Sequence, residues 1–189
     1  SGPARPFILA ILPMFFAMSG FLVPASLLRA KTTAEYVVLR VLRIVPALCV
    51  EVCVAALILG PLLTALPLRH YFADAHFATY FMNIVGKIQF QLPGMFLTNP
   101  DPGMVNRQLW TIPGEIKCYL ILCGFALAGF MRRPVLMLAV VIAAALIFPV
   151  IDMAVRKESL GGLNNVTAHS LMLAFFCGVT VYLYKDRLR

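Results

Sequence analysis

Five long apolar runs constrain the fold of this chain more than any other feature of its sequence. A helix needs about 20 residues to cross the hydrocarbon core of a bilayer. The stretches that are long and apolar enough are residues 7–28, 46–66, 110–130, 134–151 and 168–184. With 61% hydrophobic and 13% charged residues, the chain is also far more apolar than a soluble domain. The sequence therefore predicts an all-α, polytopic transmembrane helix bundle of about five spans, in a single domain over residues 1–189.

The longest connection separates the second and third predicted spans. Its residues 77–90 are amphipathic, but Asn83, Gly86 and Lys87 interrupt the apolar run. This pattern predicts a short interfacial or re-entrant helix rather than a sixth span. Residues 91–108 are rich in Pro, Gly and Asn, which is typical of ordered turns outside the bilayer.

The basic residues predict the orientation of the spans. Although the formal net charge is +8, the positive charges gather in short segments at alternate ends of the apolar runs, which argues against a nucleic-acid binder. The nine residues in these segments are Arg29, Lys31, Arg40, Arg43, Arg132, Arg133, Lys185, Arg187 and Arg189. Positive segments stay in the cytoplasm, so we expect the first residue to lie outside. Since no signal peptide precedes it, we expect this sequence to be a fragment that follows an upstream span.

The cysteines and histidines do not form a recognisable metal site. All five cysteines lie within apolar runs, and their spacing does not match a zinc motif. We therefore predict neither a bound metal nor disulfides. His70, His76 and His169 lie in or next to the predicted outer connections, and the sequence assigns no role to them.

Arg40 and Arg43 form the first candidate for chemistry. They are three residues apart in an apolar helix, residues 35–48, that we expect to run along the cytoplasmic interface and to break at Pro46. One interpretation is an anchor whose arginines reach lipid phosphates. The other is a clamp for a phosphorylated ligand, because guanidinium groups bind phosphate in a bidentate manner.

Glu115 is the second candidate. It lies about one and a half turns into the third predicted span, just after Pro113 and Gly114, which favour a kink or a late helix start. An ionisable side chain within a span is costly and is a functional candidate for that reason. Lys117 lies about 200° around the helix from Glu115, so the two should not pair. Trp110 and Tyr119 fit an aromatic belt at the membrane interface.

Ser19 and Gly20 are the third feature. Small residues in an apolar helix allow a neighbouring helix to pack closely, which is the first interpretation here. A role of Ser19 in lining a ligand site is the alternative.

Four stretches together resemble the membrane-bound acyltransferase family 3, the integral-membrane O-acyltransferases of bacterial surface-sugar modification. They are FFAMSGFL (15–22), RVLRIVP (40–46), the segment 93–120 with its motif NRQLWTIPGEIKCYL, and FFCGVTVYLY (175–184). Their order and spacing carry the resemblance, because no single motif would be specific. The chain is similar to the first half of the family's core, beginning after its first helix.

The resemblance implies transfer of an acyl group, expected to be acetyl, from acyl-coenzyme A to a hydroxyl of a lipopolysaccharide or exopolysaccharide. It implies a multi-pass protein of the bacterial inner membrane without a bound cofactor. Acyl-coenzyme A, the acceptor and the lipid bilayer would be its partners. By the same resemblance, Arg40 and Arg43 would bind the donor's phosphates, and Glu115 would act in catalysis. Ser19, Trp110 and Tyr119 would line the site.

The family's proposed catalytic base is a histidine of its first helix, which lies outside this chain, so we expect the chain alone to be inactive. Two other interpretations stay open. In a non-enzymatic transport protein, Glu51, Glu115 and the arginines would line a path through the bundle. In a truncated or degenerate homologue, the bundle would have a purely structural or partner-binding role.

Overall fold

The computed structural model describes residues 5–98, 103–156 and 166–187. Within these ranges the chain is helical, and the only β-type pairing is an isolated bridge between Gln91 and Met104. In these described ranges, five helical segments are long and apolar enough to cross a membrane. They are Ala10–Arg29, Thr33–Leu63, Arg107–Leu127, Pro134–Ala154 and Ala168–Arg187. The prediction of an all-α, polytopic bundle with about five spans is confirmed.

The chain divides into two compact units. The first unit comprises Ser1–Tyr36 and Gly114–Arg189, and the second comprises Val37–Pro113. The single domain expected over residues 1–189 stays a prediction.

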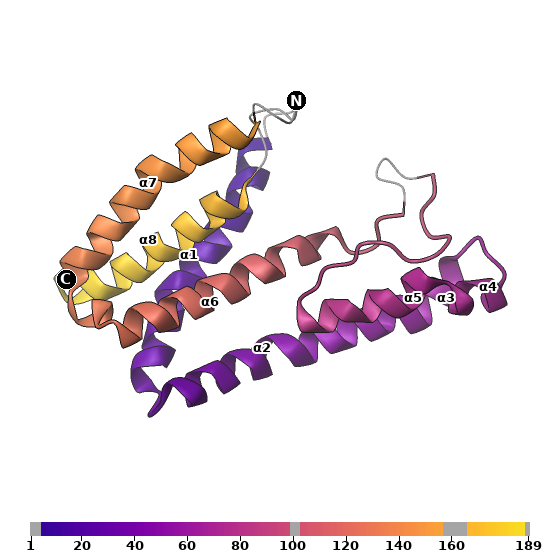
Figure 1. The fold of residues 1–189 in the computed structure, drawn as a ribbon, viewed down its shortest axis with the longest axis horizontal. Coiled ribbons are helices and arrows are strands. Elements are labelled where there is room, and N and C mark those ends of the chain that lie inside the picture. The colour runs from indigo at the N-terminus through magenta and orange to yellow at the C-terminus, as the bar shows by residue number, and fades with distance from the viewer. Residues whose placement is uncertain (1–4, 99–102, 157–165, 188–189) are drawn as a thin grey trace. The chain divides into compact units, whose positions relative to one another are not determined.

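The first unit is built from four long helices. They are α1 (Arg5–Arg29), α6 (Ile112–Leu127, from Gly114 onward), α7 (Pro134–Arg156) and α8 (Ala168–Tyr184). The short 3-10 helices η4 (Phe130–Arg132) and η5 (Lys185–Arg187) follow α6 and α8. Helix α8 lies between α1 and α7 and packs against both (Figure 1). Aromatic contacts of Phe175 and Phe176 join α8 to α6.

The contact between α1 and α8 depends on two glycines. A Cβ atom at Gly20 would lie 1.8 Å from the carbonyl oxygen of Phe175, and one at Gly178 would lie 2.0 Å from that of Ala17. Both distances are impossible for a real side chain, so the two backbones touch at this crossing. The close packing predicted from Ser19 and Gly20 is confirmed.

The second unit combines one long helical segment with short helices. The segment consists of most of α2 (Thr33–Cys53), the π-helix η1 (Val54–Leu59) and α3 (Gly60–Leu63). The short helices are α4 (Leu68–Ala73), α5 (Ala75–Tyr80), η2 (Phe81–Val85) and η3 (Arg107–Thr111). The core of this unit contains Leu48, Val52, Ala55, Ala56, Tyr71, Tyr80, Leu92, Met95 and Leu109. A short helix within residues 77–90 was predicted, and α5 with η2 confirms it.

The second span begins earlier than predicted. The sequence suggested an interfacial helix that breaks at Pro46, but α2 runs through Pro46 without interruption, so this expectation was wrong. Proline removes a single backbone donor, and membrane helices tolerate that loss where neighbouring groups satisfy the freed carbonyl. The helical segment of 31 residues is roughly 46 Å long, so it exceeds the hydrocarbon core and its ends reach the interfaces.

The π-helix is held by a tyrosine from outside the span. The amide of Gly60 donates to the carbonyl of Ala55, one residue further back than in an α-helix. In this spacing, the carbonyl of Ala56 would pair with Pro61, which has no N–H. Instead, the hydroxyl of Tyr71 donates to the Ala56 carbonyl at 2.8 Å. Gly60 makes room for it, because a Cβ atom there would lie 1.8 Å from the Tyr71 hydroxyl.

Candidate functional site

Glu115 and Tyr119 form a hydrogen-bonded pair on α6. The Tyr119 hydroxyl donates to Oε1 of Glu115, one helical turn away. Tyr119 is buried, and its ring lies edge-on to that of Phe175 on α8, with 6.0 Å between the ring centroids. Glu115 itself is half-buried. The pair therefore fixes a carboxylate within a membrane-length helix and leaves its second oxygen available to accept a further hydrogen bond.

The hydrogen bond between Tyr119 and Glu115 was not predicted from the sequence. Residues four apart lie on the same helix face, so the spacing of Glu115 and Tyr119 already carried the signal. Lys117 is exposed, as expected of a side chain that points away from Glu115. Ser19 is buried in α1. Its role in lining a site, like the roles of Glu115 and Tyr119, stays a prediction.

The second unit holds the other predicted site residues. Arg40 and Arg43 lie on the continuous helix α2, three residues apart, with Arg40 half-buried and Arg43 exposed. Trp110 is half-buried in η3, just before α6 begins. Donor binding by the arginines and site lining by Trp110 stay predictions.

A second polar pair joins the long helical segment of this unit to the connection that follows it. The side-chain amide of Gln108 in η3 donates to Oε1 of Glu51 in α2 at 2.7 Å. Glu51 is half-buried and Gln108 is exposed. Because the two residues are 57 positions apart, no local spacing in the sequence indicated this contact.

Tyr80, Asn83 and Asn106 form a group of hydrogen bonds in the same unit. Tyr80 is fully buried, and its hydroxyl accepts a hydrogen bond from the Asn106 amide at 2.9 Å. Asn83, also fully buried, donates to the carbonyls of Tyr80 and Gln89 and accepts from the Gln89 amide. Burial raises the pKa of Tyr80 to about 12, and the nearby Glu51 carboxylate adds to this rise. The hydroxyl therefore stays protonated at neutral pH.

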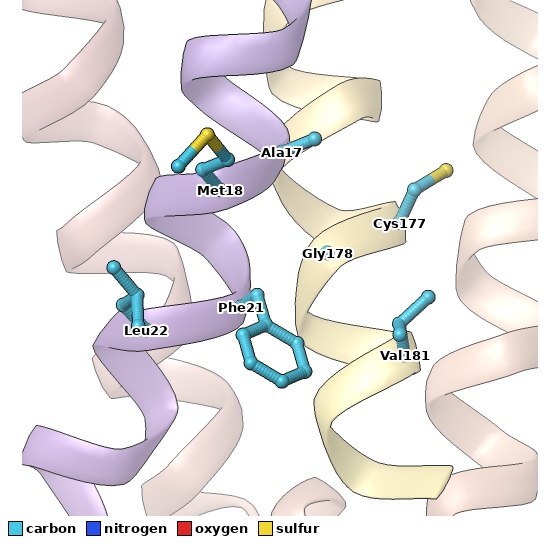
Figure 2. Close-up of a pocket in the computed structure, with 7 residues that line it drawn as sticks. All are labelled: Ala17, Met18, Phe21, Leu22, Cys177, Gly178 and Val181. Carbon is cyan, nitrogen blue, oxygen red and sulfur yellow. The ribbon is translucent and has the colours of Figure 1, made fainter. Parts of the chain in front are cut away.

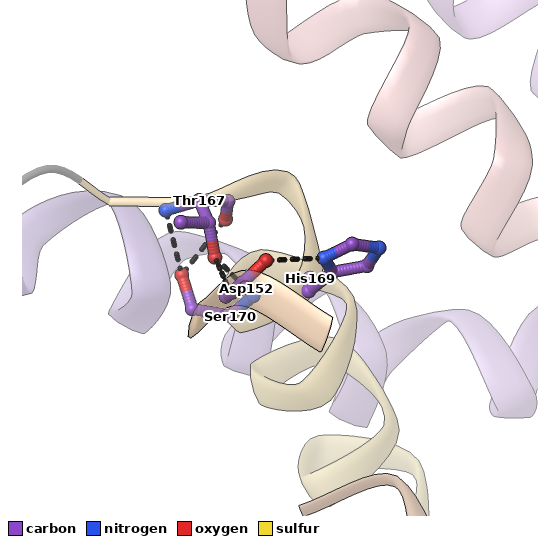
Figure 3. A network of polar contacts seen from close by, with 4 residues as sticks. All are labelled: Asp152, Thr167, His169 and Ser170. Atoms are coloured by element: carbon purple, nitrogen blue, oxygen red, sulfur yellow. Dashed lines mark hydrogen bonds and ion pairs between the residues drawn. The ribbon is translucent and has the colours of Figure 1, made fainter. Parts of the chain in front are cut away.

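Asp152 and His169 form a third polar cluster, in the first unit. Nδ1 of His169 lies 2.7 Å from Oδ1 of Asp152, and the Thr167 hydroxyl donates to Oδ2 at 2.9 Å (Figure 3). Thr167 and Ser170 form a capping box at the start of α8. The cluster thus fixes the end of α7 against the start of α8. Sequence reasoning did not consider Asp152, although it is the only carboxylate in α7.

An apolar groove of about 390 Å³ lies along α1 and α8. Figure 2 shows Phe21 between the two helices, with Met18 and Leu22 on the α1 side and Cys177 and Val181 on the α8 side. Its lining offers one thiol and otherwise only carbon, methionine sulfur and backbone atoms. This groove suits lipid chains but lacks groups that would hold a charged or polar substrate.

Comparison with known proteins gives one family match. The family model described as an acyltransferase domain matches residues 6–189. No curated protein and no solved structure matches the chain.

Proposed function

Since the chain belongs to acyltransferase family 3 and has five membrane-length helices among its described residues, it is a membrane acyltransferase, and we propose that it serves O-acylation of a carbohydrate. In this proposal the donor is acyl-coenzyme A, the transferred group is acetyl, and the acceptor is a cell-envelope glycan at the bacterial inner membrane. The family match over residues 6–189 is the observation that carries acyl transfer itself.

The chemistry requires two kinds of group. The acceptor hydroxyl attacks the thioester carbonyl, the carbon–sulfur bond breaks, and the coenzyme A thiol leaves with the proton that the hydroxyl lost. A hydroxyl attacks efficiently only if a positioned group accepts a hydrogen bond from it. Glu115 suits this role, because Tyr119 occupies one of its carboxylate oxygens and holds the other in place.

Binding of the donor requires cationic side chains. Coenzyme A carries phosphates, which guanidinium groups bind through charge-assisted hydrogen bonds. Arg40 and Arg43 lie on one helix at a spacing that puts them on neighbouring positions of its surface. Their location in a predicted cytoplasmic segment agrees with a donor that is supplied from the cytoplasm.

Two substitutions in the full-length protein test this division of roles. Arg43→Ala should weaken acetyl-coenzyme A binding about tenfold or more, because a hydrogen bond to a charged group is lost. Glu115→Gln should leave donor binding unchanged but lower kcat about 100-fold. Isothermal titration with acetyl-coenzyme A and a transfer assay measure the two effects.

Matched controls are available within the first unit. Arg29→Ala removes an exposed cation whose Nε bonds only locally, to the Ala25 carbonyl, and should not change donor binding. Glu35→Gln keeps an oxygen for the Lys31 amide that it caps and should not change kcat. Unchanged donor affinity in Arg43→Ala would overturn the phosphate clamp, and unchanged kcat in Glu115→Gln would overturn the catalytic assignment.

A further inference from the structure

Glu51 is an ionisable residue within a membrane-length helix that the proposed catalytic and donor sites do not use. It lies in the segment Thr33–Leu63, three residues before the π-helix begins. Carboxylates within spans cost free energy and mark functional positions, and π-helical turns occur frequently at such positions. Among the described residues, its hydrogen-bond partner is the neutral amide of Gln108 rather than a cation.

The Glu51–Gln108 pair presents polar groups that suit sugar hydroxyls. The Gln108 amide occupies Oε1 of Glu51, which leaves Oε2 as an acceptor. Gln108 adds its own carbonyl oxygen and a second N–H. A hydroxyl both donates and accepts, so two neighbouring hydroxyls can satisfy this set. The carboxylate would instead repel an anionic ligand such as a phosphate. The position therefore does not suit the phosphates of the donor, which Arg40 and Arg43 are proposed to bind.

The pair also has a rigid support. Gln108 is two residues beyond Asn106, whose amide is anchored on the hydroxyl of the fully buried Tyr80. Leu109, next to Gln108, is buried in the same core as Val52, next to Glu51. A binding group held by buried neighbours keeps its geometry and loses less entropy when a ligand binds.

We propose that Glu51 and Gln108 form a subsite that binds neighbouring hydroxyls of the carbohydrate acceptor. This inference rests on the proposed function, because that function supplies a carbohydrate acceptor. It adds a second group of residues, distinct from Glu115, that selects the acceptor without touching the donor.

Kinetics of the purified full-length protein test the subsite. Glu51→Gln should raise the acceptor KM about tenfold, because a charge-assisted contact to the acceptor is lost, and Gln108→Ala should raise it about fivefold, because a neutral hydrogen bond is lost. The donor KM should not change in either variant. Asp74→Asn is the matched control for loss of a carboxylate, since asparagine can still accept from the His76 amide. Gln91→Ala is the control for loss of an exposed glutamine.

Binding can be measured without catalysis, because Trp110 is the single tryptophan of the chain and lies two residues from Gln108. The probes are methyl glycosides of glucose, galactose and mannose, titrated in a detergent without a sugar headgroup. We expect at least one of them to change the Trp110 fluorescence saturably, with about tenfold weaker binding in Glu51→Gln.

The outcomes separate the two proposals. Transfer to carbohydrate with an unchanged acceptor KM in Glu51→Gln would overturn the subsite and leave the proposed function standing. Equal changes in donor and acceptor KM would indicate a structural role and would also overturn the subsite. An enzyme that transfers acyl groups but to no carbohydrate would overturn the proposed acceptor and the subsite with it. A sugar titration that is identical in wild type and Glu51→Gln, or that shows no fluorescence change with any probe, would contradict the subsite directly.

Discussion

At the scale of single residues, Tyr71 replaces a backbone donor that the second span lacks. Pro61 cannot donate to the carbonyl of Ala56, and a buried carbonyl without a partner is unfavourable. The Tyr71 hydroxyl supplies the missing hydrogen bond from outside the span, and Gly60 provides the space. Burial raises the pKa of Tyr71, so the hydroxyl keeps its proton and stays a donor.

Tyr71→Phe should therefore destabilise the protein. The ring would still fill its place in the core, but the Ala56 carbonyl would lose its partner, at a cost of about 1–3 kcal/mol. Thermal unfolding in detergent measures the change. Tyr184→Phe, which removes a hydroxyl from a half-buried position at the end of α8, is the control. Equal melting temperatures for Tyr71→Phe and wild type would show that the hydrogen bond is not needed to hold the π-helix.

Tyr80 makes stability depend on pH in the alkaline range. Its pKa is about 12 in the folded protein, against an ordinary value of 10.0. Below pH 10, folded and unfolded states both hold the proton, so this contribution is constant. Between pH 10 and about 12 it is mainly the unfolded state that loses the proton, so stability should fall, by about 2 kcal/mol at most. Unfolding measured across this range should show a smaller loss in Tyr80→Phe. The same pH slope in both proteins would contradict the prediction.

At the scale of helices, the crossing of α1 and α8 tolerates no side chain at Gly20 or Gly178. Gly20→Ala and Gly178→Ala force the two helices apart, which should cost about 1–3 kcal/mol for each substitution. Gly124→Ala is the matched control, because no atom lies within 4 Å of a Cβ there and alanine favours a helix. Unfolding in detergent compares the three variants. An effect of Gly20→Ala no larger than that of Gly124→Ala would show that the crossing can relax.

The sequence predicted most of these helices because apolar length alone defines a membrane span. It failed at Pro46, where a proline that would end a soluble helix is tolerated within a span. The pairs Tyr71–Ala56 and Glu51–Gln108 could not be predicted from the sequence, because their residues are 15 and 57 positions apart. The Glu115–Tyr119 pair differs, because a spacing of four residues on a helix is itself a signal for such a contact.

At the scale of the whole molecule, the charge distribution predicts which end of each span faces the cytoplasm. Helix α7 offers a test within one unit, because exposed residues precede and follow it. Arg132→Cys should be cytoplasmic and Ala168→Cys should be outside, in a protein whose five native cysteines are replaced by alanine. A membrane-impermeant maleimide should label Ala168→Cys in right-side-out vesicles and Arg132→Cys in inverted ones. The opposite labelling pattern would reverse the predicted orientation.

The π-helix also affects how related chains should be aligned. It contains one residue more than an α-helix of the same length needs, so a relative could lack one residue within Val54–Leu59 and keep an unbroken span. Such a deletion would restore α-helical spacing and leave the segment before it facing the same way, because six π-helical residues turn through about the same angle as five α-helical ones. Glu51 would then stay on the side of Gln108. A one-residue gap at this place in an alignment should therefore be compatible with the same pair of residues at the positions of Glu51 and Gln108.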